Sequence, residues 1–169
     1  MIFITVGTHE QQFNRLIKCI DDMKNEGKIA EDVYMQTGFS TYEPKYCMWD
    51  RLIPYSQMKK NVAEARIVIT HGGPASFIMP LQVGKIPIVV PRKVEFDEHV
   101  NNHQLDFAKA VSERQGNIIV VEDIDELENV ILNYEDMIAS MSKEMRSNNA
   151  KFNEKFEICV EELLQERKK

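Results

Sequence analysis

The feature that most constrains the fold is a series of short apolar, β-branched runs, each of which breaks off at glycine or polar residues. Between these runs, apolar residues recur at helical spacing. Strands that alternate with helices predict an α/β fold with a parallel sheet and helices on both faces, because parallel strands need long crossover connections. The predicted strands are residues 1–6, 32–36, 51–53, 65–70, 86–91 and 117–121.

The predicted helices follow from apolar spacing and from residues that favour helix starts and stops. Ser56 is a suitable N-cap for the second helix, and Gly84 is a suitable stop for the third. The stretch 39–50, with mixed polar residues and Pro44, is predicted to be a loop. The four helices are expected at residues 13–20, from 56 onward, at 75–83 and at 101–112.

The chain has 169 residues, which allows one domain with a full core and is too short for two ordinary ones. Residues 1–123 carry the strand pattern and are predicted to form that domain. Residues 124–169 show apolar residues at helix-compatible intervals among mostly charged ones, which predicts a C-terminal helical tail. We expect its first half to pack on the domain, and its second half on the domain or on a partner subunit. The pattern consists of Tyr134, Ile138, Met141, Met145, Phe152, Phe156 and Leu163.

Composition excludes several classes of protein. A formal net charge of -6 argues against a general nucleic-acid binder, which needs a surplus of Lys and Arg to neutralise phosphates. No apolar run approaches the ~20 residues that cross a bilayer, and the opening segment lacks the basic part of a signal peptide. Three cysteines without metal-ligand spacing are expected to be reduced thiols of a cytoplasmic protein. They are Cys19, Cys47 and Cys159.

Two glycine-containing loops directly follow predicted strands, at the edge where open α/β sheets bind their ligands. In the first loop, Gly7 allows a sharp turn or the close approach of a ligand. Thr8 and His9 add hydrogen-bonding groups beside it. The alternative interpretation is a glycine that serves only to turn the chain after the first strand.

The second loop, residues 70–76, lies between a strong strand pattern and a strong helix pattern. The start of a helix presents unpaired N–H groups and a partial positive charge, which suit a diphosphate. Gly72 and Gly73 remove side chains that would block its approach, and Ser76 can donate its hydroxyl. A tight turn with a capped helix is the alternative, but a histidine, two glycines, a proline and a serine together favour the phosphate site.

A third cluster gathers two histidines, two asparagines and a glutamine beside carboxylates, just before the fourth predicted helix. Amide and imidazole groups pair well with vicinal hydroxyls, so the cluster suits the recognition of a sugar. Glu98, His99 and His103 also allow a metal site, which is disfavoured because the two histidines lack a convincing third ligand. A capped helix start at Asn101 or Asn102 is the remaining interpretation, and the residues alone do not decide.

Five motifs that occur in order connect these clusters. They are ITVGT at 4–8, QTG at 36–38, ARIVITHGG at 65–73, GKIPIVVPR at 84–92 and NNHQ at 101–104. With this spacing, the stretch from 1 to 121 resembles the C-terminal, donor-binding domain of glycosyltransferase family 28. It is similar to stand-alone bacterial members from capsule and exopolysaccharide operons. Those resemble the catalytic subunit of the two-subunit UDP-N-acetylglucosamine transferase of dolichol-linked oligosaccharide synthesis.

The resemblance implies a Rossmann-like domain that is half of a GT-B fold, with the activity of a metal-independent, inverting, UDP-sugar-dependent hexosyltransferase. It implies no cofactor, and a separate membrane-associated partner subunit that binds the acceptor. The expected substrates are a UDP-sugar donor and a lipid-linked sugar acceptor of capsule or exopolysaccharide synthesis, with β-1,4-galactosyl transfer as one candidate reaction. The chain would then be cytoplasmic, at the inner face of the plasma membrane through its partner.

The resemblance also implies which residues contact the substrate. One group would face the phosphates or the interdomain cleft, an apolar pair would lie near the uracil, and a polar group would lie near the donor sugar. The first group is Gly7 and Thr8. A further group would line the diphosphate itself, and it consists of His71, Gly72, Gly73 and Ser76. The apolar pair is Ile53 and Met58. The polar group is Asn102, His103 and Gln104, and Arg92 and His99 complete the expected set.

The general base and one departure from the family pattern leave the activity open. His9 and Glu10 are the candidates for the base because their loop is expected to open at the cleft, although the partner could supply it. Related enzymes often place a ribose-binding Glu where this chain has Met79, followed by Pro80. A non-catalytic accessory subunit that stimulates a partner transferase is therefore the main alternative. A sugar-nucleotide epimerase with a related loop is the third.

Overall fold

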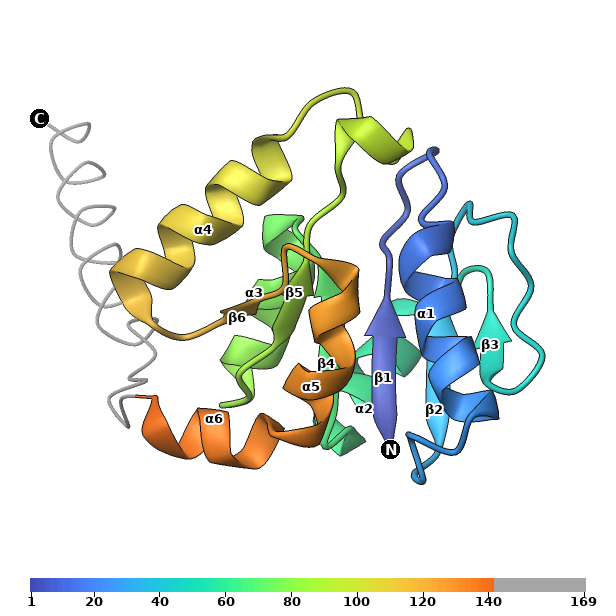
Figure 1. Ribbon diagram of the computed structural model, residues 1–169, viewed down its shortest axis with the longest axis horizontal. Helices are drawn as coiled ribbons and strands as arrows, with labels where there is room; N and C mark the ends of the chain where they lie inside the picture. Colours follow the sequence, from blue (N-terminus) through green and yellow to red (C-terminus); the bar gives the residue numbers. More distant parts are fainter. Residues whose placement is uncertain (142–169) are drawn as a thin grey trace, which may run out of the picture.

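The computed structural model describes residues 1–141, which form one six-stranded sheet with all strands parallel (Figure 1). The strand order is β3-β2-β1-β4-β5-β6, so the chain winds outward in both directions from the β1–β4 pair. This order confirms the predicted Rossmann-like α/β fold. The strands are β1 (Ile2–Thr5), β2 (Val33–Gln36), β3 (Met48–Asp50), β4 (Ile67–His71), β5 (Ile88–Val90) and β6 (Ile119–Val120).

Helices cover both faces of the sheet, as the sequence predicts. None of the helices within residues 1–141 is long and apolar enough to cross a membrane. One face carries α1 (Asn14–Asn25), the 3-10 turn η2 (Ile124–Glu126), α5 (Leu127–Leu132) and α6 (Tyr134–Ser140). The other carries α2 (Tyr55–Glu64), α3 (Pro74–Gln82) and α4 (His103–Gln115), and a second 3-10 turn, η1 (Val94–Phe96), precedes α4.

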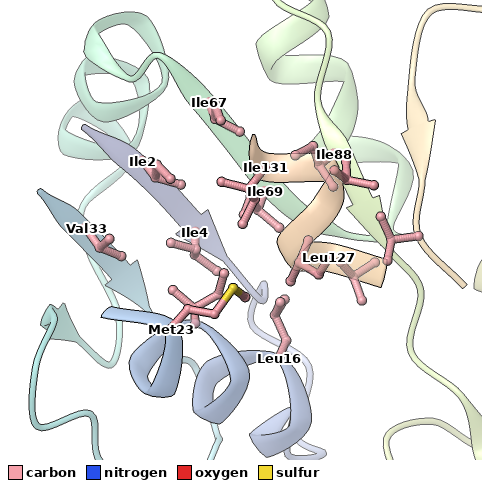
Figure 2. Close-up of a cluster of buried hydrophobic side chains, with 14 of the residues drawn as sticks. Ile2, Ile4, Leu16, Met23, Val33, Ile67, Ile69, Ile88, Leu127 and Ile131 are labelled. Carbon is pink, nitrogen blue, oxygen red and sulfur yellow. The ribbon is translucent and has the colours of Figure 1, made fainter. Parts of the chain in front are cut away.

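The core consists of alternate residues of the central strands, which point to opposite faces of the sheet. Ile4 and Ile69 pack against α1 and α5 on one face, as Figure 2 shows. Phe3 and Val68 pack against α2 on the other. Both sets are almost wholly buried, which explains why these strands are uninterrupted apolar runs in the sequence rather than alternating ones.

The beginning of the predicted tail belongs to this same core. Leu127 and Ile131 are buried against the sheet beside α1 (Figure 2). The hydroxyl of Tyr134 donates a hydrogen bond to the carbonyl of Ile86 at 2.7 Å. The later pattern residues lie outside the described part of the chain; they are Met145, Phe152, Phe156 and Leu163.

The third strand lies three residues earlier than predicted. The carboxylate of buried Asp21 accepts hydrogen bonds from the backbone N–H groups of residues 45–47, at 2.9, 2.9 and 3.1 Å, and from the Tyr42 hydroxyl at 2.9 Å. This anchor on α1 brings the next residues beside β2, so Met48–Asp50 forms the strand and 51–53 does not. The prediction of a loop throughout 39–50 is therefore wrong for its last three residues.

Three predicted helix boundaries also differ. α1 continues to Asn25, beyond the expected end at residue 20. α2 begins at Tyr55 after Pro54, so Ser56 lies inside the first turn and is not the N-cap. α4 runs from His103 to Gln115 rather than over 101–112. It ends where Gly116 adopts the left-handed conformation, with φ of 57°.

Candidate functional site

A hollow of about 410 Å³ opens at the carboxyl ends of β1 and β4, the upper edge of the sheet in Figure 1. The helices α2 and α3 form its walls. We call it the β1–β4 hollow, and it lies where open parallel sheets bind ligands. Its lining residues are Thr5, Gly7, Thr8, His9, Gln36, Met58, Val62, His71, Ala75, Ser76 and Met79.

A second hollow, of about 630 Å³, lies against the beginning of α4. We call it the α4 hollow. The first residues of α3 border both hollows, because Pro74 lines this one while Ala75 lines the β1–β4 hollow. The lining residues of the α4 hollow are Gly72, Gly73, Pro74, His99, His103, Gln104, Asp106 and Phe107.

The imidazole of His71 is packed between two glycines. A methyl group added at Gly7 would lie 2.5 Å from the ring carbon Cε1 of His71, and one added at Gly73 would lie 2.4 Å from its Nε2. Both distances are well inside van der Waals contact. The two glycines therefore make room for the imidazole, which closes the gap between β1 and the start of α3.

This packing corrects the expectation that the glycines of the second loop mainly clear a path for a ligand. A methyl group at Gly72 would meet Cβ of Gln104 at 2.8 Å, so this glycine also lies against the protein itself. A bulky substitution at Gly73 would displace His71 before it blocked any ligand. Such a variant is therefore a poor test of ligand binding.

His71 is a neutral residue at physiological pH. Only 8% of it is exposed, and burial together with the nearby charge of Arg92 lowers the pKa of His71 to about 4. Its Nδ1 is buried and makes no hydrogen bond of ordinary geometry within the described residues, although the backbone of Thr5 lies close enough to the ring to act against the lowering of the pKa. A neutral imidazole can donate one hydrogen bond to a ligand oxygen but adds no charge.

The start of α3 offers free backbone donors between the two hollows. The N–H of Gly72 donates to the side-chain oxygen of Gln104 at 3.1 Å, and that of Ser76 donates to the carbonyl of Gly73 at 3.0 Å. Within residues 1–141, no acceptor engages the N–H groups of Gly73 and Ala75. These donors and the positive end of the helix dipole suit an anionic group.

The loop after β1 brings His9 to the β1–β4 hollow. Its ring contacts that of His99, with the ring centroids 5.0 Å apart and the planes tilted by 37°, and His99 lines the α4 hollow. Slight burial, Arg92 and His99 together lower the pKa of His9. Its Nδ1 accepts a hydrogen bond from the N–H of Gln11 at 3.2 Å, which places the proton of the neutral ring on Nε2. Glu10 is exposed and lines neither hollow.

Arg92, an expected substrate contact, lies behind the hollows instead. Its side chain is fully buried, and its guanidinium donates to four backbone carbonyls. The acceptors are Gln11 and Gln12 at 2.9 Å each, Glu98 at 3.1 Å and Val6 at 2.9 Å. Arg92 thus joins the end of β1 and the loop before α1 to the loop that precedes α4. Its long side chain reaches these carbonyls and not the ligand space.

Glu98 also has a structural partner. Its carboxylate accepts from Arg15 Nε at 3.0 Å and Nη2 at 2.9 Å, and from the N–H of Lys93 at 3.1 Å. Both oxygens are thereby engaged, so Glu98 is not free to complete a metal site with His99 and His103. Among residues 1–141, no three His, Cys, Asp or Glu side chains are grouped to hold a metal ion.

The polar group at the start of α4 has two kinds of member: Asn102 and Gln104 bond to the backbone, whereas His103 is exposed. Asn102 accepts from the N–H of Val94 at 3.0 Å, and the side-chain oxygen of Gln104 accepts from Gly72 and, at 3.3 Å, from the N–H of Arg92. His103 is exposed at the α4 hollow and remains available to a ligand.

The apolar pair expected near the uracil is also divided. Met58 lines the β1–β4 hollow, whereas Ile53 packs, half-buried, beside the core formed by Phe3 and Val68. Met79 lines the hollow where family resemblance leads one to expect a carboxylate. Sequence reasoning missed further lining residues, although most of them end strands or lie one turn beyond a residue that it found. They are Thr5, Gln36, Val62, Asp106 and Phe107.

A Rossmann-like sheet whose carboxyl edge carries a helix start with free backbone N–H groups has an architecture that is common among nucleotide-binding proteins. Comparison with known families is more specific, since the model of the glycosyltransferase family 28 C-terminal domain matches residues 1–161. The chain belongs to this family, which confirms the resemblance seen in the sequence. The protein is therefore related to glycosyltransferases.

Two individual proteins are also similar to parts of this chain. The chain is 33% identical over 117 residues to the UDP-N-acetylglucosamine transferase subunit ALG13 of Homo sapiens, which covers 64% of this chain and 10% of that protein. The chain thus spans about a tenth of its curated relative. The crystal structure of the glycosyltransferase SnogD from Streptomyces nogalater matches with a TM-score of 0.49 and 15% identity, over 83% of this chain and 39% of that one.

Proposed function

We propose that the chain is the donor-binding, catalytic subunit of an inverting, UDP-sugar-dependent glycosyltransferase. The observation that carries the proposal is the open start of α3, with free N–H groups at Gly73 and Ala75 between two hollows. A diphosphate suits those donors, while a nucleoside and a sugar need separate spaces on either side of it. The human relative is named as a UDP-N-acetylglucosamine transferase subunit, which supports a UDP-sugar as the donor.

The two hollows differ in chemistry, as the two ends of a UDP-sugar require: one offers an apolar surface and the other offers polar groups. In the β1–β4 hollow, the half-buried Met58 and Met79 offer an apolar surface for the flat base. In the α4 hollow, His103 and Asp106 offer hydrogen bonds to sugar hydroxyls. We assign the nucleoside to the first and the donor sugar to the second.

The proposed reaction is a single displacement. The acceptor hydroxyl attacks the anomeric carbon from the face opposite the diphosphate, the new bond forms as the bond from that carbon to the diphosphate breaks, and UDP leaves. The α3 start stabilises the negative charge that grows on the diphosphate. The acceptor proton passes to a base, and His9 is our candidate on this chain. Its Nδ1 must give up the bond from Gln11 to act as that base.

A charge reversal at the helix start tests the donor site. Ala75→Glu places a carboxylate in the first turn of α3, where it favours the helix but repels a diphosphate. We expect this variant to keep its thermal stability and to lose UDP affinity by about tenfold or more in calorimetric titration. Ala110→Glu, an exposed position farther along α4, is the matched control. Equal UDP affinity in the two variants would refute the donor site.

We further propose that a membrane-associated partner subunit supplies the acceptor-binding half of a GT-B enzyme. The transferred hexose and the lipid-linked acceptor, including a capsule or exopolysaccharide intermediate, belong to this proposal, as does a position at the inner face of the plasma membrane. The test is co-expression with the neighbouring operon product, followed by assays of a panel of UDP-sugars on a lipid-linked acceptor. If His9→Ala lowers turnover of that complex without changing UDP affinity, His9 is the base.

Met79 favours a second candidate, a non-catalytic accessory subunit. Its thioether lines the β1–β4 hollow and offers ribose hydroxyls no strong hydrogen-bond acceptor. The same calorimetric titration separates the two functions. Micromolar binding of UDP supports the transferase, whereas a lack of UDP binding even in the presence of the partner supports the accessory role.

A further inference from the structure

Arg15, Glu98 and Arg92 form a cluster with one net positive charge behind the hollows. Glu98 and Arg92 have no exposed surface, and only 13% of the Arg15 side chain is exposed. The carboxylate of Glu98 is paired in a two-point contact with Arg15, which neutralises that guanidinium. The guanidinium of Arg92 meets backbone carbonyls and the ring of Phe13, whose centroid lies 4.9 Å away.

A buried charge without a direct counter-ion is costly, so its position calls for a reason. Four carbonyl dipoles and an aromatic face compensate Arg92 only in part. The charge is permanent near neutral pH, because burial lowers the pKa of Arg92 only to about 10, while the nearby charge of Glu98 acts in the opposite direction. The fold therefore maintains a fixed cation inside the protein at this point.

The guanidinium of Arg92 contacts the residue before the β1–β4 hollow, and the backbone of Arg92 contacts a residue of the α4 hollow. Arg92 Nη2 donates to the carbonyl of Val6, and the next residue, Gly7, lines the β1–β4 hollow. The backbone N–H of Arg92 donates to the side-chain oxygen of Gln104, which lines the α4 hollow and also holds Gly72. After burial, Arg92 is the main cause of the lowered pKa of His9 and His71, both of which line the β1–β4 hollow.

We propose that this Arg15–Glu98–Arg92 cluster is the fixed counter-charge for the diphosphate of the ligand, an inference that rests on the proposed donor site. Arg92 reaches neither hollow, so it acts as a positioning residue, through its field and through the loops that it joins. Its field has the same sign as that of the α3 helix dipole, so the two add for an anionic ligand. A buried charge is screened far less than a surface one, so a single cation suffices to favour a polyanionic ligand.

The test compares ligands that differ only in charge. Wild-type protein and variants are titrated with UDP, uridine and inorganic pyrophosphate, followed by NMR, which detects weak binding. Arg92→Gln is expected to weaken the binding of UDP and pyrophosphate by about tenfold more than the binding of uridine. Arg92→Lys keeps the charge and loses hydrogen bonds, so it lowers Tm but retains the preference for UDP over uridine. Arg66→Gln, an exposed arginine at the opposite edge of the sheet, is the matched control and changes none of the three affinities.

If both Arg92 variants lose affinity for UDP and for uridine to the same extent, the proposal is overturned, because the role of Arg92 is then structural alone. If Arg92→Gln does not fold, Glu98→Gln provides the opposite test. It raises the net charge of the cluster and is expected to tighten UDP and pyrophosphate several-fold, as an order-of-magnitude estimate, but not uridine; unchanged or weaker binding overturns the proposal.

Failure of the proposed function gives a different result. If the wild type binds pyrophosphate but neither UDP nor uridine, the nucleotide-sugar function is refuted and the counter-charge proposal stands. If the wild type binds UDP and neither Arg92→Gln nor Glu98→Gln changes the UDP affinity, the counter-charge proposal fails and the nucleotide-sugar function stands. If the wild type binds neither UDP nor pyrophosphate, both proposals fail.

Discussion

Alanine at Gly7 is expected to destabilise the protein far more than alanine at Gly27, although the two glycines share the same left-handed backbone. Their φ angles are 75° and 73°. An alanine methyl at Gly27 meets nothing within 4 Å, so only the backbone penalty of about 1 kcal/mol remains. At Gly7 the methyl would also lie 2.5 Å from the imidazole of His71. Overpacking of this kind costs about 1–3 kcal/mol, so we expect a difference of about 2 kcal/mol between the variants.

A double-mutant cycle separates the contact from the backbone. Both alanine variants are made in wild-type and His71→Ala backgrounds, and the free energy of unfolding is measured by urea titration. Removal of the imidazole should recover about 2 kcal/mol for Gly7→Ala and nothing for Gly27→Ala. Gly73→Ala, with an ordinary φ of -75°, should behave like Gly7→Ala without the backbone penalty. Equal costs at Gly7 and Gly27, with no coupling to His71, would refute the packing of His71 between glycines.

Three further predictions concern pH, the third strand and the tail. Because the pKa of His71 in the folded state is about 4, below its ordinary value, its contribution to stability is complete above pH ~6.5 and is lost as the pH falls toward ~4. Wild type should lose about 3 kcal/mol more than His71→Gln over that range, and parallel pH profiles would contradict this. Asp21→Asn should cost about 3 kcal/mol in chemical denaturation, because an amide cannot accept all of the hydrogen bonds that the carboxylate accepts; a cost below about 1 kcal/mol would show that those bonds do not fix β3. Leu127→Ala should cost about 3 kcal/mol, against less than about 0.5 for exposed Leu132→Ala, and equal losses would show that α5 is not part of the core.

Much of the fold follows from local sequence. The buried strands are continuous apolar runs because both of their faces are covered, and Gly84 and Gly116 follow α3 and α4 where those helices end. The third strand is the exception. Its position depends on Asp21, a residue on another element whose bonds to residues 45–47 no local pattern reveals.

The site was predictable as a place but less so in its details. Residues that directly follow β1 and β4 had to meet at one edge of a parallel sheet, and Gly7, His71 and Ser76 all line the β1–β4 hollow. The sequence could not show that two glycines accommodate an imidazole, since Gly7 and the loop that carries His71 and Gly73 are far apart in the sequence. Nor could it show that Arg92 is turned inward, because an arginine after a strand is equally suited to bind a phosphate.

The strand order has a consequence for any molecule held at the seam between β1 and β4. Strands β1 to β3 lie on one side of that seam, and strands β4 to β6 lie on the other. A ligand that contacts the loops of both halves would therefore cross-link the two halves of the sheet. When the protein is saturated with such a ligand, amide hydrogen exchange should slow even in the segments that follow β2 and β5, where the ligand makes no contact.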